Sequence, residues 1–223
     1  MNTEEYRKQF RKEHIPSWYI GYVHLTFTVL VSVFIIGWGV GQLNSIQWYE
    51  WLIVPVTFVY ANLMEYLGHR YVMHVHRKGF KQIYVRHSKQ HHRFFTDKNM
   101  PFEGHQDYKV TLFPILLVVF FFGLFGVPMW FLIQYFLGDN MTWLFVIVAV
   151  AYFLNYEIFH FAFHCREDSW LMKIPGFKKV RTLHLHHHVP ELMSKYNFNI
   201  TYPIGDWIFG TYYSSHNKNN NHA

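Results

Sequence analysis

The sequence has 223 residues, of which 51% are hydrophobic, 21% aromatic and only 15% charged, and its net charge is +6. This length fits one compact domain, and so few charges are unusual for a soluble surface but typical of a chain that meets lipid. The single cysteine excludes an intrachain disulfide. We therefore expect a single membrane domain over residues 1–223.

The placement of the basic residues indicates topology and argues against a nucleic-acid-binding protein. All twenty Lys and Arg residues lie within residues 7–12, 70–109 and 166–218, and none lies within 13–69 or 110–165. If each of the last two intervals is a membrane hairpin, every basic residue lies on one side. The positive-inside rule assigns that side to the cytoplasm.

Long apolar runs predict the membrane-spanning helices. Residues 1–16 are polar and form a cytoplasmic N-terminal segment, and the predicted spans that follow are 17–40, 48–68, 110–127 and 142–163. Each is close to or above the roughly 20 residues that a helix needs to cross a bilayer. The polar tail, residues 214–223, is predicted to be disordered.

Residues 128–138 decide how many times the chain crosses. As a helix this segment is about 16 Å long, which is too short to cross alone. It therefore either extends a neighbouring helix or lies at the interface. We expect four crossings with both termini in the cytoplasm, because only an even number of crossings places all histidine-rich segments on one side.

Four histidine boxes are the chemical signature of this chain: HRYVMH, HSKQHH, HFAFH and HLHHH. Their members are His69, His74, His87, His91, His92, His160, His164, His184, His187 and His188. A lone histidine is usually a core or surface residue, but four clusters on one membrane face are not explained by packing. Imidazole binds iron, zinc, copper and nickel, and ten imidazoles exceed what one ion can hold. The sequence predicts two metal ions.

The spacing within the boxes suggests how the histidines divide. Adjacent helical residues point about 100° apart, so His187 and His188 are predicted to face different ions, and the second box repeats this doublet. His69 and His74 are about 140° apart on an ideal helix. Either they serve different ions or the helix loosens there.

Acidic residues offer a competing metal site. Glu157 and His160 form E-x-x-H, the motif of carboxylate-bridged di-iron bundles, but such sites need a second motif and further glutamates. Elsewhere in the predicted spans only Glu65 lies near a histidine box, so an all-histidine site is the better interpretation. Glu65, Glu157 and Asn155 are then candidates to orient ligand histidines through their second ring nitrogen. The alternative for the glutamates is that they extend toward the membrane surface.

The ordered boxes, followed by NFNITYPIGDWIFGTYY, resemble the fatty acid hydroxylase and sterol desaturase superfamily of integral-membrane oxygenases. The resemblance covers about residues 65–213. The second box departs from the pattern, because three residues separate His87 from its doublet where many members have two.

The resemblance implies a dioxygen-dependent di-iron lipid mono-oxygenase, in which zinc can replace iron on purification. It favours hydroxylation of a fatty acyl chain of a membrane lipid. A sterol or fatty acid desaturase, a methyl oxidase and a carotenoid hydroxylase are alternatives. The sequence given has no Rossmann glycine pattern and no ferredoxin cysteine set. We therefore expect an external electron donor, either a small b-type cytochrome or a ferredoxin with its reductase.

Two rivals come from other classes of protein. A histidine-rich metal transporter needs polar ligands near the middle of the bilayer, whereas the middle of each predicted span is Val, Phe, Leu and Ile. A membrane cytochrome would place paired histidines inside facing spans. An oxidoreductase is the interpretation that uses all four boxes.

Overall fold

The computed structural model describes residues 1–214. Within them the regular structure is helical, with a single isolated β-bridge between Thr96 and Asn99, which confirms the predicted all-α class. Residues 215–223, most of the tail predicted to be disordered, lie outside the described part.

Four helical segments are long and apolar enough to cross a membrane, as predicted: Gly21–Gly41, Trp48–Met73, His105–Leu137 and Asp139–Phe163. The first is α2 (Gly21–Gly41) and the last is α9 (Asp139–Phe163). The second consists of η1 (Trp48–Leu52), α3 (Ile53–Gly68) and η2 (His69–Met73). The third consists of η4 (His105–Asp107), α6 (Tyr108–Thr111), α7 (Ile115–Phe121), η5 (Phe122–Gly126) and α8 (Val127–Leu137).

The differences from the predicted boundaries are local. The second span continues past residue 68 to Met73, so it carries the first histidine box up to its last residue, His74, which caps the helix. Residues 128–138 extend the third span as α8, which resolves the open alternative. Pro114 lacks the N–H that a continuous helix needs, and the chain is extended there, between α6 and α7.

The spans pack around α9, which contacts α2, α3 and α8. Gly39 permits a close approach of α2, because a Cβ atom at that position would lie 2.9 Å from Cγ1 of Ile147 on α9. Large apolar side chains such as Leu30 and Phe34 are exposed on the outer face of α2. Such a surface suits lipid and not water.

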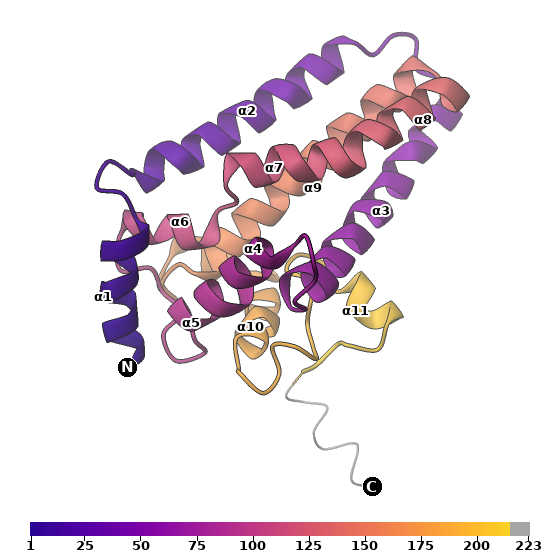
Figure 1. The fold of residues 1–223 in the computed structure, drawn as a ribbon. Coiled ribbons are helices and arrows are strands. Elements are labelled where there is room, and N and C mark those ends of the chain that lie inside the picture. Colours follow the sequence, from indigo (N-terminus) through magenta and orange to yellow (C-terminus); the bar gives the residue numbers. More distant parts are fainter. Residues whose placement is uncertain (215–223) are drawn as a thin grey trace, which may run out of the picture.

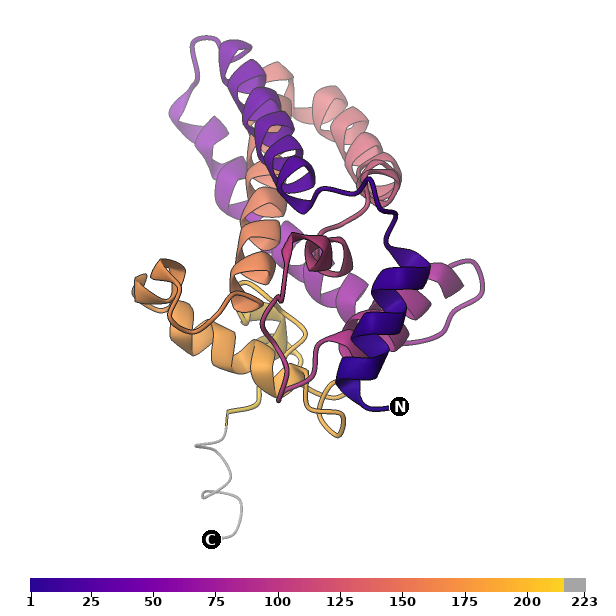
Figure 2. The ribbon, with the colours of Figure 1, turned by 90° about the vertical axis from the view of Figure 1, so that its left-hand side faces the viewer.

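Shorter helices gather at one end of the four spans (Figures 1 and 2). They are α1 (Thr3–His14), α4 (Lys81–Tyr84), η3 (Val85–His91), α5 (His92–Phe94), η6 (Trp170–Lys173), α10 (Phe177–His187) and α11 (Ile204–Ile208). All four histidine boxes lie at this end, as the parity argument requires, and α1 lies there too. The assignment of this end to the cytoplasm stays a prediction.

Candidate metal centre

The structure brings nine of the ten box histidines into two buried groups. His69, His74, His87, His92 and His187 form the first group. His91, His164, His184 and His188 form the second group. Within each group one ring nitrogen of every member lies within 4.8 Å of the others, so each group could hold a metal ion.

His160 lies at the border of the second group. Its Nε2 atom is 3.3 Å from Nε2 of His91, and its side chain is buried. It also lines a small cavity of about 30 Å³ beside His87 and His91. That volume suits one water-sized molecule. His160 is therefore placed next to the second group without being within reach of all its members.

Two π-helical turns explain spacings that an ideal α-helix does not allow. In η2 the backbone N–H of His74 donates to the carbonyl of His69, and in η3 that of His92 donates to the carbonyl of His87. These i to i+5 bonds bring residues five apart onto one face, and such π turns are frequent at functional sites. The helix therefore loosens at the first box, which was one of the two alternatives. The π turn of η3 likewise places His87 and His92, five residues apart, in the same group.

In the first group, backbone and hydroxyl acceptors orient the rings. Nδ1 of His69 donates to the carbonyl of Phe198, and Nδ1 of His187 donates to that of Tyr196. Nδ1 of His74 lies 3.3 Å from the hydroxyl oxygen of Ser88, whose own proton goes to the carbonyl of Met73. Each of these Nδ1 atoms therefore carries the proton, and each Nε2 is left with a bare lone pair.

These lone pairs converge. Nε2 of His74 lies 3.1 Å from Nε2 of His69 and 3.0 Å from Nε2 of His187. No proton is left to join them, so three electron-rich nitrogens face one another at hydrogen-bond distance. A cation between them would convert repulsion into coordination. The tautomers set by the acceptors therefore fit a metal ion.

Three carbonyls orient the second group in the same way. Nδ1 of His188 donates to Phe95 at 2.7 Å, Nδ1 of His91 to Val110 at 3.1 Å and Nδ1 of His164 to Met100 at 3.2 Å. The Nε2 atom of His184 lies 3.1 Å from that of His188 and 3.2 Å from that of His164. A hydrogen bond from the distal nitrogen to a carbonyl is the usual support of a metal-ligating histidine.

Burial keeps these imidazoles neutral. It lowers the pKa of His187 to about 4, against a hydrogen bond to the carbonyl of Tyr196 that raises it. Burial is also the main cause that holds the pKa of His92 and His184 well below 6.5, and neighbouring histidines add to it. Neutral imidazole is the form that binds a metal, so the groups are ready to do so at neutral pH.

Glu65, Glu157 and Asn155, the candidates from the sequence to orient ligand histidines, make no direct hydrogen bond to them within residues 1–214. Among the described residues no carboxylate hydrogen-bonds to a box histidine, and carbonyls take that place. One carboxylate oxygen of Glu157 accepts from the backbone N–H of Phe113, while its other oxygen and Nδ2 of Asn155 are buried without a partner.

Glu65 acts instead on the chain that follows the fourth box. Its carboxylate accepts from the backbone N–H groups of Ile200 and Thr201, from the Thr201 hydroxyl and from the Tyr152 hydroxyl. Asp206 accepts from the backbone N–H of Phe198, whose carbonyl orients His69. Sequence reasoning missed these orienting carbonyls, because a backbone acceptor leaves no signal in residue identity.

An apolar cavity of about 380 Å³ reaches the first group from between the spans. Its walls come from α3, η2, α7, η5 and α9. They are aliphatic and aromatic except for Glu65 and His69. Along α9 the lining extends from Phe145 to Tyr156, about 16 Å at the helical rise. His69 thus belongs both to a histidine group and to the wall of this cavity.

The four spans and the two buried groups define a helical membrane protein with a polyhistidine site that could hold metal ions. The fold is similar to that in a structure of full-length scs7p, in which only the hydroxylase domain is visible, with a TM-score of 0.61 and 20% sequence identity. The similarity covers 87% of this chain and 67% of that chain. It confirms, at the level of the fold, the resemblance suggested by the boxes. No family model and no curated protein matches the sequence.

Proposed function

We propose that each histidine group holds one iron ion and that the protein is a dioxygen-dependent lipid mono-oxygenase that acts on a fatty acyl chain. The observation that carries the proposal is the position of His69, a member of the first group that also lines the apolar cavity. This position joins a metal-binding site to a space that suits a hydrocarbon chain. The hydroxylase domain of similar fold supports the same class of reaction.

In this proposal the histidines are neutral ligands that hold two ions side by side. When iron is bound, such a centre supplies activation of dioxygen, and the net reaction converts a C–H bond, dioxygen, two electrons and two protons into a C–OH group and water. The residues of the chain position the ligand imidazoles and the substrate. Carbonyls fix five of the imidazoles, those of His69, His91, His164, His187 and His188. The apolar walls keep water from the carbon that reacts.

The cavity indicates which part of a lipid is attacked. The histidine groups lie at the end of the spans, and the lining extends about 16 Å along α9 toward the middle of the bilayer. A lipid whose tail fills this space places a carbon near its polar head beside His69. We therefore propose attack close to the headgroup, such as at the second carbon of an acyl chain.

The electrons come from another protein in this proposal, a small b-type cytochrome or a ferredoxin with its reductase. The basic segments 70–109 and 166–181 lie mainly at the histidine end of the spans. Positive charge there would attract an acidic electron carrier and speed its encounter with the centre.

Reconstitution with ferrous iron, a reducing partner, isotope-labelled dioxygen and mixed membrane lipids tests the proposal. Mass spectrometry should find one labelled oxygen atom in an acyl chain. Label in a sterol or carotenoid would change the substrate class, and an unlabelled alkene would identify a desaturase, which shares the first hydrogen abstraction. Protein that holds two iron ions but oxidises none of these lipids would contradict the proposal.

A further inference from the structure

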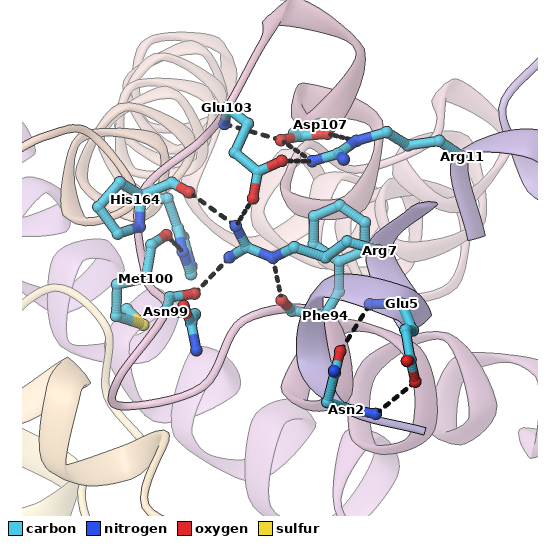
Figure 3. A network of polar contacts seen from close by, with 11 residues as sticks. Asn2, Glu5, Arg7, Arg11, Phe94, Asn99, Met100, Glu103, Asp107 and His164 are labelled. Carbon is cyan, nitrogen blue, oxygen red and sulfur yellow. Dashed lines mark hydrogen bonds and ion pairs between the residues drawn. The ribbon is translucent and has the colours of Figure 1, made fainter. Parts of the chain in front are cut away.

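Arg7 on α1 is a buried cation far in sequence from every histidine box. Its side chain is 4% exposed, and its guanidinium donates to three backbone carbonyls, those of Phe94, Asn99 and Pro101. It also pairs with the carboxylate of Glu103 at 2.7 Å. Figure 3 shows Arg7 between these groups, at the segment of residues 94–103. The planar fork of arginine suits such a multiple contact.

The same segment presents alternate carbonyls to the second group. The carbonyl of Phe94 accepts from Arg7, whereas the carbonyl of the next residue, Phe95, orients His188. The carbonyls of Asn99 and Pro101 accept from Arg7. The carbonyl of Met100, which lies between them in the chain, orients His164. Arg7 and the second group therefore bind alternate carbonyls of one short segment.

The rest of α1 fixes Arg7 in place. Arg11, one turn later, makes a bidentate pair with the buried carboxylate of Asp107 at 2.7 and 2.9 Å and also pairs with Glu103. At the start of the helix, Asn2 and Glu5 form a reciprocal capping box, which stabilises the first turn. The ion pairs of Arg7 and Arg11 hold α1 in place, so the guanidinium of Arg7 is positioned against residues 94–103.

We propose that Arg7 is a positioning residue for the second histidine group and acts through the carbonyls of Phe95 and Met100. Without Arg7, the carbonyls of Phe94, Asn99 and Pro101 lose this donor and residues 94–101 can rotate. The hydrogen bonds that hold Nδ1 of His188 and His164 then weaken. The inference rests on the metal centre proposed above and gives the N-terminal helix a part in it.

The first group provides a natural comparison because a different residue fixes its orienting loop. The carboxylate of Asp206 accepts from the backbone N–H groups of Phe198 and Asn199, and the carbonyl of Phe198 orients His69. Asp206 is fully buried, and within residues 1–214 its side chain hydrogen-bonds to Phe198, Asn199 and Thr211 and not to residues 94–103. The two groups should therefore respond separately to changes at Arg7 and Asp206.

The test measures ferrous iron binding to full-length protein under anaerobic conditions. The His187→Ala protein should retain the ion of the second group, and the His188→Ala protein that of the first. Adding Arg7→Ala should weaken iron binding by about tenfold or more in the His187→Ala protein, within the range seen when outer-shell partners of metal ligands are lost. Arg7→Ala should leave iron binding unchanged in the His188→Ala protein. In that same protein, Asp206→Asn should weaken iron binding.

Lys8→Ala is the matched control, because Lys8 is exposed on the same helix. Equal weakening of both sites by Arg7→Ala, or none at either, would overturn the inference. If Arg7→Ala does not fold, Arg7→Lys takes its place, with a smaller loss expected at the second site alone. Wild-type protein that binds fewer than two ions would refute the proposed centre itself, whereas two ions unaffected by Arg7 would refute only this role.

Discussion

His187 and His188 are neighbours in the chain, yet their Nε2 atoms belong to different groups. Nε2 of His187 lies 3.0 Å from that of His74, and Nε2 of His188 lies 3.1 Å from that of His184. The end of α10 therefore stands between the two groups. An adjacent pair of histidines can in this way serve two ions, as the angle between neighbouring helical residues suggests.

Replacing one member of this doublet should therefore remove one ion. His187→Ala should empty the first site and His188→Ala the second, each leaving about one ion per chain by elemental analysis. His186→Ala is the matched control on the same turn, because its ring contacts Tyr213 and belongs to neither group. Loss of both ions in either doublet variant would show that the groups are not separate sites.

The topology gives a second prediction. In a Cys165→Ser background, cysteines at Asn44 and Asp139 should react with an impermeant thiol reagent from outside the cell or from the organelle lumen. Both positions are exposed. Asn44 follows the C-terminal end of α2 and Asp139 begins α9, and these helix ends lie away from the histidine end of the spans (Figure 1). A cysteine at Lys98, near the second group, should be protected from that side. Its labelling there would contradict the cytoplasmic assignment.

The cavity predicts a difference between two adjacent valines of α7. Val118 lines the cavity, whereas Val119 is 64% exposed and is not part of its wall. Val118→Trp should fill part of the space, lower turnover of long acyl chains by about tenfold or more and shift preference toward shorter chains. Val119→Trp should change neither. Product analysis with substrates of graded length measures the effect, and equal behaviour of the two variants would mean that the lipid binds elsewhere.

The metal-free protein should lose stability in mild acid. The pKa of His187 is about 4 in the folded state and about 6.5 in an unfolded chain. Between these values the unfolded chain binds a proton that the folded protein does not. The free energy of unfolding therefore falls as the pH falls, by up to about 1.4 kcal/mol per pH unit for this group.

Thermal unfolding of chelated protein at pH 7.5, 6 and 5 measures this slope. The midpoint should decrease with pH, and His187→Gln should reduce the decrease because glutamine does not titrate. A midpoint independent of pH over this range would show that the histidines are not held neutral by burial.

Much of the fold follows from local features of the sequence. The four spans are apolar runs of sufficient length, and the even number of crossings follows from the need to bring all histidine boxes to one side. The division of the doublets follows from helical geometry. The π turns at His69 and His87 were visible only as irregular spacings, because a spacing of five residues does not by itself distinguish a loosened helix from ligands of two ions.

The supports of the site were less accessible to sequence reasoning. Glu65 was singled out because it lies in a predicted span one turn from the first histidine box, but its partners include backbone groups of residues 200 and 201 that become neighbours only in the fold. In the sequence, Arg7 is one of several charged residues in a polar segment. Its role depends on the alternation of carbonyls some 90 residues later in the chain, which residue types do not encode.

The count of metal ions in the wild-type protein tests the central claim most directly. Protein purified from iron-supplemented cells, or reconstituted anaerobically with ferrous iron, should contain two ions per chain by elemental analysis. Zinc in place of iron agrees with the same sites, because imidazole groups bind zinc more tightly than ferrous iron. One ion or none in fully reconstituted, folded protein would contradict the two-ion centre.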